Sequence, residues 1–173
     1  MFDSFYPYKL SHHRYAGPDD GWEELFLYAF KAADNQRYLI ELERYSHEVY
    51  GIKFYPKAWT NSPHRYSRLT GNGLPQPIIR TCLQVMVDRL ELRPNASFAF
   101  ISEAIQGESK RNTKRHRVYQ QVMENFFPGS RFYHVSYEAQ SAYLLFNRNQ
   151  PRSLIPTIEQ LFQDLFEVGE KDP

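Results

Sequence analysis

The chain has 173 residues, of which 42% are hydrophobic and 16% aromatic, and its formal net charge is +1. This much apolar and aromatic material excludes a disordered protein, and the length fits one domain, residues 1–173, with a sizeable core. The near-neutral charge excludes a global field that would attract nucleic acid or anionic membranes, so electrostatic recognition needs a local patch.

The single cysteine, Cys82, rules out an internal disulfide and argues against a cysteine-based zinc site. The six histidines lack metal-ligand spacing, so we expect no metal. No apolar run approaches the roughly 18 residues of a membrane span, and the N-terminus lacks a signal-peptide pattern. We therefore expect a cytoplasmic protein that does not enter a membrane.

Residues 1–22 are predicted to form an irregular N-terminal arm, because prolines and glycines interrupt them. Aromatic side chains recur in this arm and predict that it lies against the domain. The alternative is an arm that packs on a second subunit and forms a homodimer. The aromatic residues are Phe2, Phe5, Tyr6, Tyr8 and Trp22.

Three strands are predicted next, because aromatic and aliphatic residues alternate in three successive runs. This pattern is typical of an antiparallel meander with one buried face. The first run also fits a helical period through Leu25, Tyr28 and Ala29, but its aromatic content favours a strand. The alternating positions are Phe26, Tyr28, Phe30 and Ala32, then Tyr38, Ile40 and Leu42, then Tyr50, Ile52 and Phe54.

The remaining pattern predicts a helix over 75–90, a buried central strand over 97–102 and a second helix over 113–127. A hairpin over 131–147 and a C-terminal helix near Ile158 follow. The predicted order is βββ-α-β-α-ββ-α, an α+β fold with a mixed, mostly antiparallel sheet flanked by three helices.

Two short motifs stand before and after the predicted strand over 97–102. The first, Arg68-Leu69-Thr70-Gly71-Asn72-Gly73, has the form R-x-x-G-x-G and precedes a predicted helix. It resembles the pyrophosphate loop in the acyl-CoA half of GNAT-type N-acetyltransferases. Glycines there let backbone N–H groups approach phosphates. The resemblance implies a GNAT-like fold in which Arg68, Gly71, Asn72 and Gly73 bind acetyl-CoA or another acyl-CoA.

The second motif, Asn112 followed by Val118-Tyr119, resembles the family pattern N-x-x-A-x-x-L-Y. It implies that Asn112 contacts the cofactor region and that Tyr119 protonates the departing CoA thiolate. Arg115 stands where the family has Ala, and Pro75 and Pro77 remove N–H donors near the glycine loop. These departures leave a degenerate, inactive member of the family as an open interpretation.

A cluster of cations precedes and opens the second helix. Cations at a helix start oppose the macrodipole, so an anionic partner such as a nucleic acid or an acidic protein would stabilise them. The alternative to the enzyme is therefore a non-enzymatic binding module that uses this segment; a solvated loop is the simpler reading. The cations are Lys110, Arg111, Lys114, Arg115 and Arg117.

Three features of the chain form a further pattern: the aromatic meander from Phe26, the helix LPQPIIRTCLQVMVDRL from Leu74, and the strand and basic helix from Ser97 to Phe127. Together they resemble a family of bacterial proteins known only as a domain of unknown function. The resemblance covers about residues 24–167, implies a compact α+β domain, and brings no functional residues. Glu41, Glu43 and Glu48 lie on or near the second strand and are carboxylates able to act as a base, but the sequence selects none of them.

Overall fold

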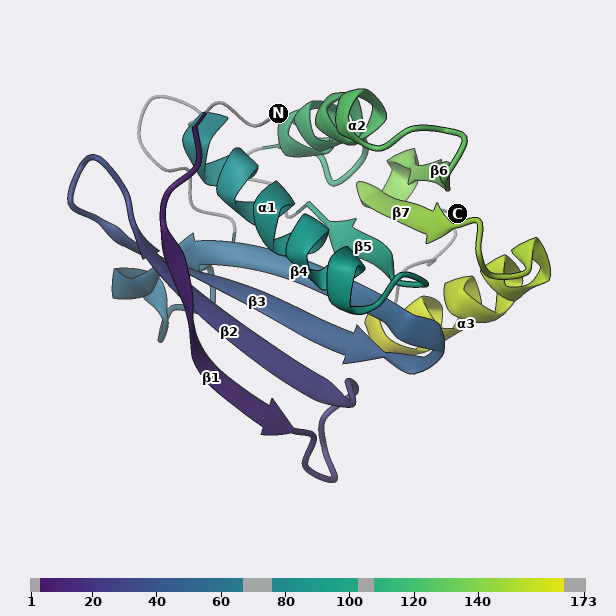
Figure 1. Cartoon of the computed structure of the whole chain (residues 1–173), viewed down its shortest axis with the longest axis horizontal. Coiled ribbons are helices and arrows are strands. Elements are labelled where there is room, and N and C mark those ends of the chain that lie inside the picture. The colour runs from purple at the N-terminus through teal and green to yellow at the C-terminus, as the bar shows by residue number, and fades with distance from the viewer. Residues whose placement is uncertain (1–3, 67–75, 103–107, 167–173) are drawn as a thin grey trace.

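The computed structural model describes residues 4–66, 76–102 and 108–166 (Figure 1). It contains one seven-stranded sheet with strand order β1-β2-β3-β4-β5-β7-β6. The strands are β1 (Tyr8–Tyr15), β2 (Glu24–Lys31), β3 (Arg37–Tyr45), β4 (Val49–Pro56), β5 (Ser97–Ile101), β6 (Phe132–Tyr137) and β7 (Ala142–Asn147). The helices are α1 (Gln76–Leu92), α2 (Lys114–Phe126) and α3 (Ile155–Phe166), with short 3-10 turns at Ser46–Glu48, Lys57–Trp59, Glu138–Gln140 and Arg152–Leu154.

Most neighbouring strands are antiparallel, and β4 and β5 form a parallel pair connected through α1. The α+β class, the mostly antiparallel sheet and the three helices are therefore confirmed. The run that also fitted a helix is the strand β2, and β5 lies inside the sheet with four of its five residues buried.

The helices form layers on both faces of the sheet (Figure 1). Helices α1 and α2 cover one face, where Leu83, Met86 and Met123 pack on Ile40, Phe98 and other even-numbered strand residues. Helix α3 covers the other face, where Ile158 packs with residues such as Tyr45 and Phe146. Phe126, the last residue of α2, is 39% exposed although it is apolar.

The N-terminal arm differs from the prediction, because Tyr8–Tyr15 is a regular strand rather than irregular chain. It pairs antiparallel with β2 and slips register between Leu10 and His12. Its seven residues after Tyr8 are exposed, so they carry no alternating apolar pattern, and backbone pairing with β2 defines the strand. The expected contact with the domain exists: Tyr6 stacks on Phe30 at 5.7 Å, and its N–H donates to Thr81 Oγ1.

Candidate functional site

The parallel pair β4 and β5 separates soon after it begins. The register joins Val49 to Ser97, Tyr50 to Phe98 and Gly51 to Ala99, and ends there. Beyond this point β4 continues along β3 to Pro56, and β5 continues along β7 to Ile101. The facing backbone edges of the two strands therefore diverge at the middle of the sheet.

Three aromatic rings mark the helical side of this divergence. Phe54 on β4 and Phe100 on β5 both contact Tyr119 of α2, with ring centroids 6.4 and 5.0 Å from the Tyr119 centroid. Even-numbered residues of both strands point to this face, and α2 places Tyr119 across them. Tyr119, the last residue of the second motif, thus lies where the strands part.

The phenol of Tyr119 is held in its neutral form. Burial raises the pKa of Tyr119 well above 10, and the nearby Cys82 thiol acts in the same direction while Arg115 opposes it. At neutral pH the hydroxyl can donate a proton and cannot act as a base. This is the protonation state that a general acid needs.

A network of carboxylates and tyrosines lies on the opposite face of β3 and β4. Tyr55 and Tyr66 donate hydrogen bonds to the two oxygens of Glu41, at 3.0 and 2.6 Å. Tyr45 donates to Glu43 at 2.6 Å, and Lys53 Nζ lies 3.3 Å from the same carboxylate. Burial, together with these carboxylates, raises the pKa of each tyrosine hydroxyl.

Sequence reasoning did not identify this network, although a signal existed. Glu41 and Glu43 alternate with the core residues of β3, and Lys53 and Tyr55 alternate in the same way on β4. Polar residues of opposite charge at period two on adjacent strands predict a paired second face. Glu48, the third carboxylate considered from sequence, lies elsewhere, 3.8 Å from Arg93.

The start of α2 is anchored to the turn between β6 and β7. Thr113 caps the helix by accepting from the N–H of His116. Ser141 Oγ donates to the carbonyl of Lys110 and accepts from the N–H of Thr113. The Asn112 N–H donates to the Glu138 carbonyl, so the backbone of the basic segment is held on both sides of Asn112.

The predicted basic segment is divided by this anchoring. Lys110, Arg111, Lys114 and Arg117 are exposed. Arg115 is only 7% exposed, and its guanidinium donates to the Tyr66 carbonyl. Arg115 therefore cannot belong to the exposed basic surface expected from the sequence; it connects α2 to the segment after β4 instead.

The predicted phosphate-binding residues Arg68, Gly71, Asn72 and Gly73 lie outside the described residues. The helix that follows them begins at Gln76, close to the predicted boundary, with Pro77 in its first turn. The structure thus describes where α1, Asn112 and Tyr119 lie, whereas the loop with Gly71 and Gly73 stays a prediction.

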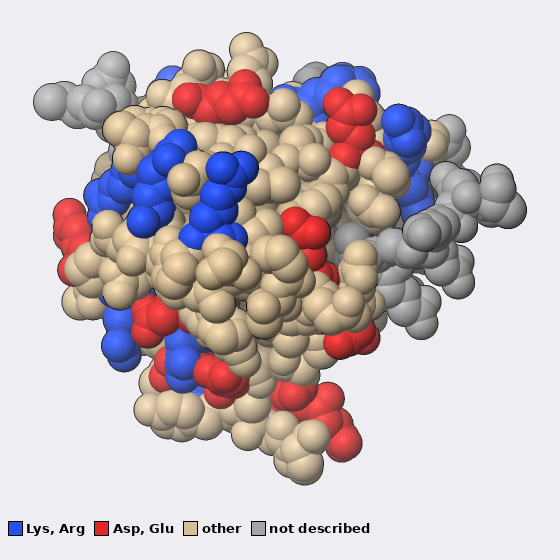
Figure 2. Space-filling view, turned by 90° about the vertical axis from the view of Figure 1, so that its right-hand side faces the viewer, with Lys and Arg blue, Asp and Glu red and all other residues tan. Residues whose placement is uncertain are grey.

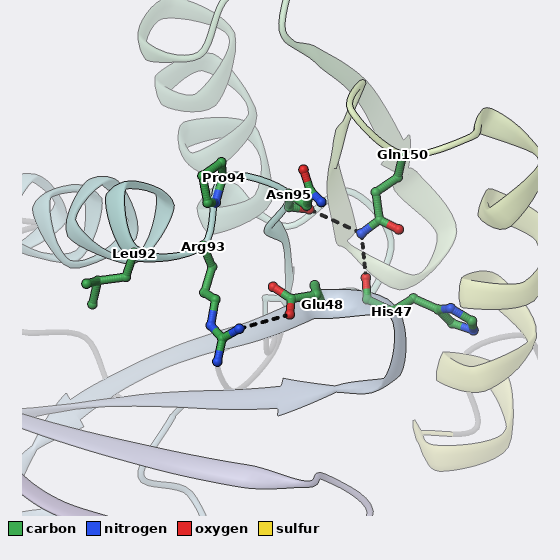
Figure 3. Close-up of a pocket in the computed structure, with 7 residues that line it drawn as sticks. All are labelled: His47, Glu48, Leu92, Arg93, Pro94, Asn95 and Gln150. Atoms are coloured by element: carbon green, nitrogen blue, oxygen red, sulfur yellow. Dashed lines mark hydrogen bonds and ion pairs between the residues drawn. The ribbon is translucent and has the colours of Figure 1, made fainter.

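A shallow pocket lies at the other end of the β4–β5 pair, next to the C-terminal end of α1 (Figure 3). Gln150 spans it, and its side-chain amide donates to the carbonyls of His47 and Asn95 at 2.8 and 3.2 Å. Arg93 and Glu48 form an ion pair on its other side. The polar groups that line the pocket thus bond to one another, and these bonds join α1, β4 and the chain after β7.

Among the described residues, no three His, Cys, Asp or Glu side chains come together as a metal site. No helix within that same part of the chain has the length and apolar character needed to cross a membrane. Burial raises the pKa of the Cys82 thiol, so this thiol is a poor nucleophile.

Comparison with known proteins adds no relative: no family model matches the chain, and neither does a curated protein or a solved structure.

Proposed function

We propose that this protein is an acyl-CoA-dependent N-acyltransferase of GNAT-like architecture, with Tyr119 as the proton donor. The observation that carries the proposal is the short parallel pairing of β4 and β5, with the neutral Tyr119 phenol at the point where the strands part. The alternative of a degenerate, inactive member is decided by the experiment below.

The diverging strands fit an extended acyl-pantetheine chain for a physical reason. Backbone N–H and C=O groups at an open strand edge bind an extended chain as an added strand does. The order β4–α1–β5 also directs the start of α1 to the same end of the sheet, where a helix N-terminus favours phosphate groups. Arg68, Gly71, Asn72, Gly73 and Asn112 are the proposed contacts for the cofactor.

The proposed reaction transfers the acyl group from the thioester to an amine. The amine nitrogen attacks the thioester carbonyl, the C–S bond breaks, and the hydroxyl of Tyr119 donates its proton to the departing thiolate. Burial raises the pKa of Tyr119, so the phenol is protonated at neutral pH and carries the proton that is transferred. The proton lost from the amine returns to the phenolate through solvent.

The first arm of the test measures binding. Acetyl-CoA at about 100 times its Kd should stabilise the protein by about 2.7 kcal/mol, seen as a rise in Tm. The absence of any shift with acetyl-CoA, CoA or longer acyl-CoAs would contradict the proposal.

The second arm measures transfer to a panel of primary amines through the release of free thiol. Cys82 is buried and should add little background. Tyr119→Phe keeps the ring contacts and should lower turnover by about 10²–10⁴-fold while the Kd for acetyl-CoA is retained. Tyr15→Phe is the matched control, since Tyr15 is 71% exposed on β1. Binding without transfer would identify the inactive alternative.

A second function, binding of an anionic partner by the basic segment, is favoured by one observation. The four exposed cations stand on a backbone that Ser141 and Glu138 fix in place, so the segment is ordered rather than a solvated loop. Replacing Lys110, Arg111, Lys114 and Arg117 by Ser should then weaken binding to a nucleic acid or acidic peptide and flatten its salt dependence. Unchanged binding would remove this candidate.

A further inference from the structure

Two arginines stack on one tyrosine at the end of the β6–β7 hairpin that lies far from the basic segment, and a third stands next to them. The guanidinium carbons of Arg148 and Arg152 lie 3.6 and 4.7 Å from the centroid of the Tyr133 ring. The backbone of Arg131 lies beside Arg148, whose N–H donates to the Arg131 carbonyl at 2.9 Å, and the Arg131 guanidinium carbon lies 5.7 Å from the centroid of the neighbouring Phe132 ring. All three arginines are exposed, and Tyr133 is half-buried. We call Arg131, Arg148 and Arg152 with Tyr133 the arginine patch.

The arginine patch brings like charges together. Arg131 and Arg148 follow the last register pair of the hairpin, Phe132 with Asn147, so they stand opposite one another on adjacent strands. Like charges at such positions destabilise a sheet. No ion pair joins any of these arginines to a carboxylate in the described part of the chain.

The position of Arg152 is also unfavourable without a partner. It opens the turn Arg152–Leu154, which runs directly into α3. The N-terminal end of a helix carries partial positive charge, and another cation there is repelled. An anion at the arginine patch would relieve the repulsion between Arg131 and Arg148 and also the repulsion between Arg152 and the N-terminal end of α3.

The patch is open to solvent on the face that α3 shares with the β6–β7 hairpin. Figure 2 views the molecule from that side and shows Lys and Arg side chains gathered together on the surface. Contact with the Tyr133 ring restricts the guanidinium groups of Arg148 and Arg152, so they lose less freedom when a ligand binds. The fork of N–H donors on each guanidinium matches the oxygens of a phosphate.

We propose that the arginine patch binds a phosphate-bearing ligand, either a free oligophosphate or the backbone of a single-stranded nucleic acid. The observation in favour of phosphate is that the cations are all arginines and that the Tyr133 ring holds two of the guanidinium groups close together, which suits several bidentate contacts to a group of multiple charge. This site is separate from the divergence of β4 and β5, and the inference does not depend on the acyltransferase proposal.

The test measures the affinity of the full chain for three probes: tripolyphosphate, a short oligouridylate and a short polyglutamate peptide. We expect the two phosphate probes to bind more tightly than polyglutamate. A tighter complex with tripolyphosphate identifies a free oligophosphate as the ligand, and a tighter complex with oligouridylate identifies nucleic acid. Polyglutamate binding as tightly as the phosphate probes, or no binding of either phosphate probe, overturns the proposal.

Variants locate the binding on the surface. Arg148→Gln with Arg152→Gln should raise the Kd for the phosphate probe about tenfold or more and reduce its salt dependence, because fewer cations meet phosphate. Arg37→Gln is the matched control, an exposed arginine on β3, and should leave the Kd unchanged. If the arginine-patch variant binds as tightly as the original chain, the proposal is wrong.

Discussion

Gly51 gives the carboxylate network on β3 and β4 the space it occupies. A Cβ atom at this position would lie 3.1 Å from Cε2 of Tyr45 and 3.8 Å from Oε2 of Glu43. Tyr45 cannot easily move away, since it is 2% exposed and its hydroxyl is bonded to Glu43. Glycine is therefore favoured at position 51 because a side chain there would crowd Tyr45, and not because the backbone turns at this point.

Gly51→Val should lower the free energy of unfolding by about 1–3 kcal/mol, because the added methyl groups overpack the contact with Tyr45. Urea unfolding followed by tyrosine fluorescence measures the change. Gly129→Ala is the control: nothing lies within 4 Å of a Cβ there, and the expected change is within about 0.5 kcal/mol. Equal free energies of unfolding for the two variants would mean that the Tyr45 side chain can move away from the added methyl groups without loss of stability.

At the scale of elements, the contact between α2 and β6 contains a buried histidine. His116 is fully buried, and its Nε2 lies 2.9 Å from Ser136 Oγ. Its Nδ1 has no hydrogen-bond partner among the described residues. Burial lowers the pKa of His116 below the usual 6.5, although the Glu138 carboxylate and the Ser141 backbone act in the opposite direction.

This histidine should make stability depend on pH. Between its folded pKa and 6.5 the unfolded chain binds more protons than the folded chain, so acidification favours unfolding. The stability that neutral His116 contributes to the folded state is complete above about pH 6.5 and is lost as the pH falls toward the pKa of His116 in the folded chain.

His116→Gln should therefore flatten the fall in unfolding free energy on acidification below about pH 6.5, measured by urea titrations at several pH values. His12→Gln, at an exposed site on β1, should leave that slope as it is. A slope that survives in the His116 variant would assign the pH dependence to other groups.

The sequence predicted those elements whose residues carry a burial pattern. The alternation in β2–β4 and the apolar run of β5 are local signals, and the structure has both of them. The strand β1 carries no such pattern, because the seven residues after Tyr8 are exposed and do not alternate between apolar and polar.

The site was less predictable than the fold, because its residues meet only through tertiary contacts. Arg115 sits in a run of cations, and only the nearby carbonyl of Tyr66 explains why it is buried. Arg131, Arg148 and Arg152 are spread over the sequence and meet because β6 and β7 pair and α3 follows. Spacing along one element cannot reveal such a cluster.

At the scale of the whole molecule, the sheet consists of two antiparallel groups, β1–β4 and β5–β7. They are joined in the sheet by only the three register pairs between β4 and β5. The antiparallel pairs on either side extend over longer registers, such as the eight pairs between β3 and β4. The junction is thus the part of the sheet with the least backbone pairing, and it is also the proposed site for the acyl chain.

Hydrogen exchange can test this junction directly. Acetyl-CoA bound between the strands should slow amide exchange in peptides covering 52–56 and 97–102, because an extended ligand chain would occupy edges that the two strands leave open to each other. Peptides covering β1 and β2 should exchange at the same rate with and without the ligand, and they provide the internal control.

Protection confined to α2 and the hairpin turn would place the ligand at the basic segment instead, and would count against the acyltransferase proposal. Protection that appears with acetyl-CoA and is retained in Tyr119→Phe would separate binding from proton donation, as expected if Tyr119 acts on the departing thiolate alone.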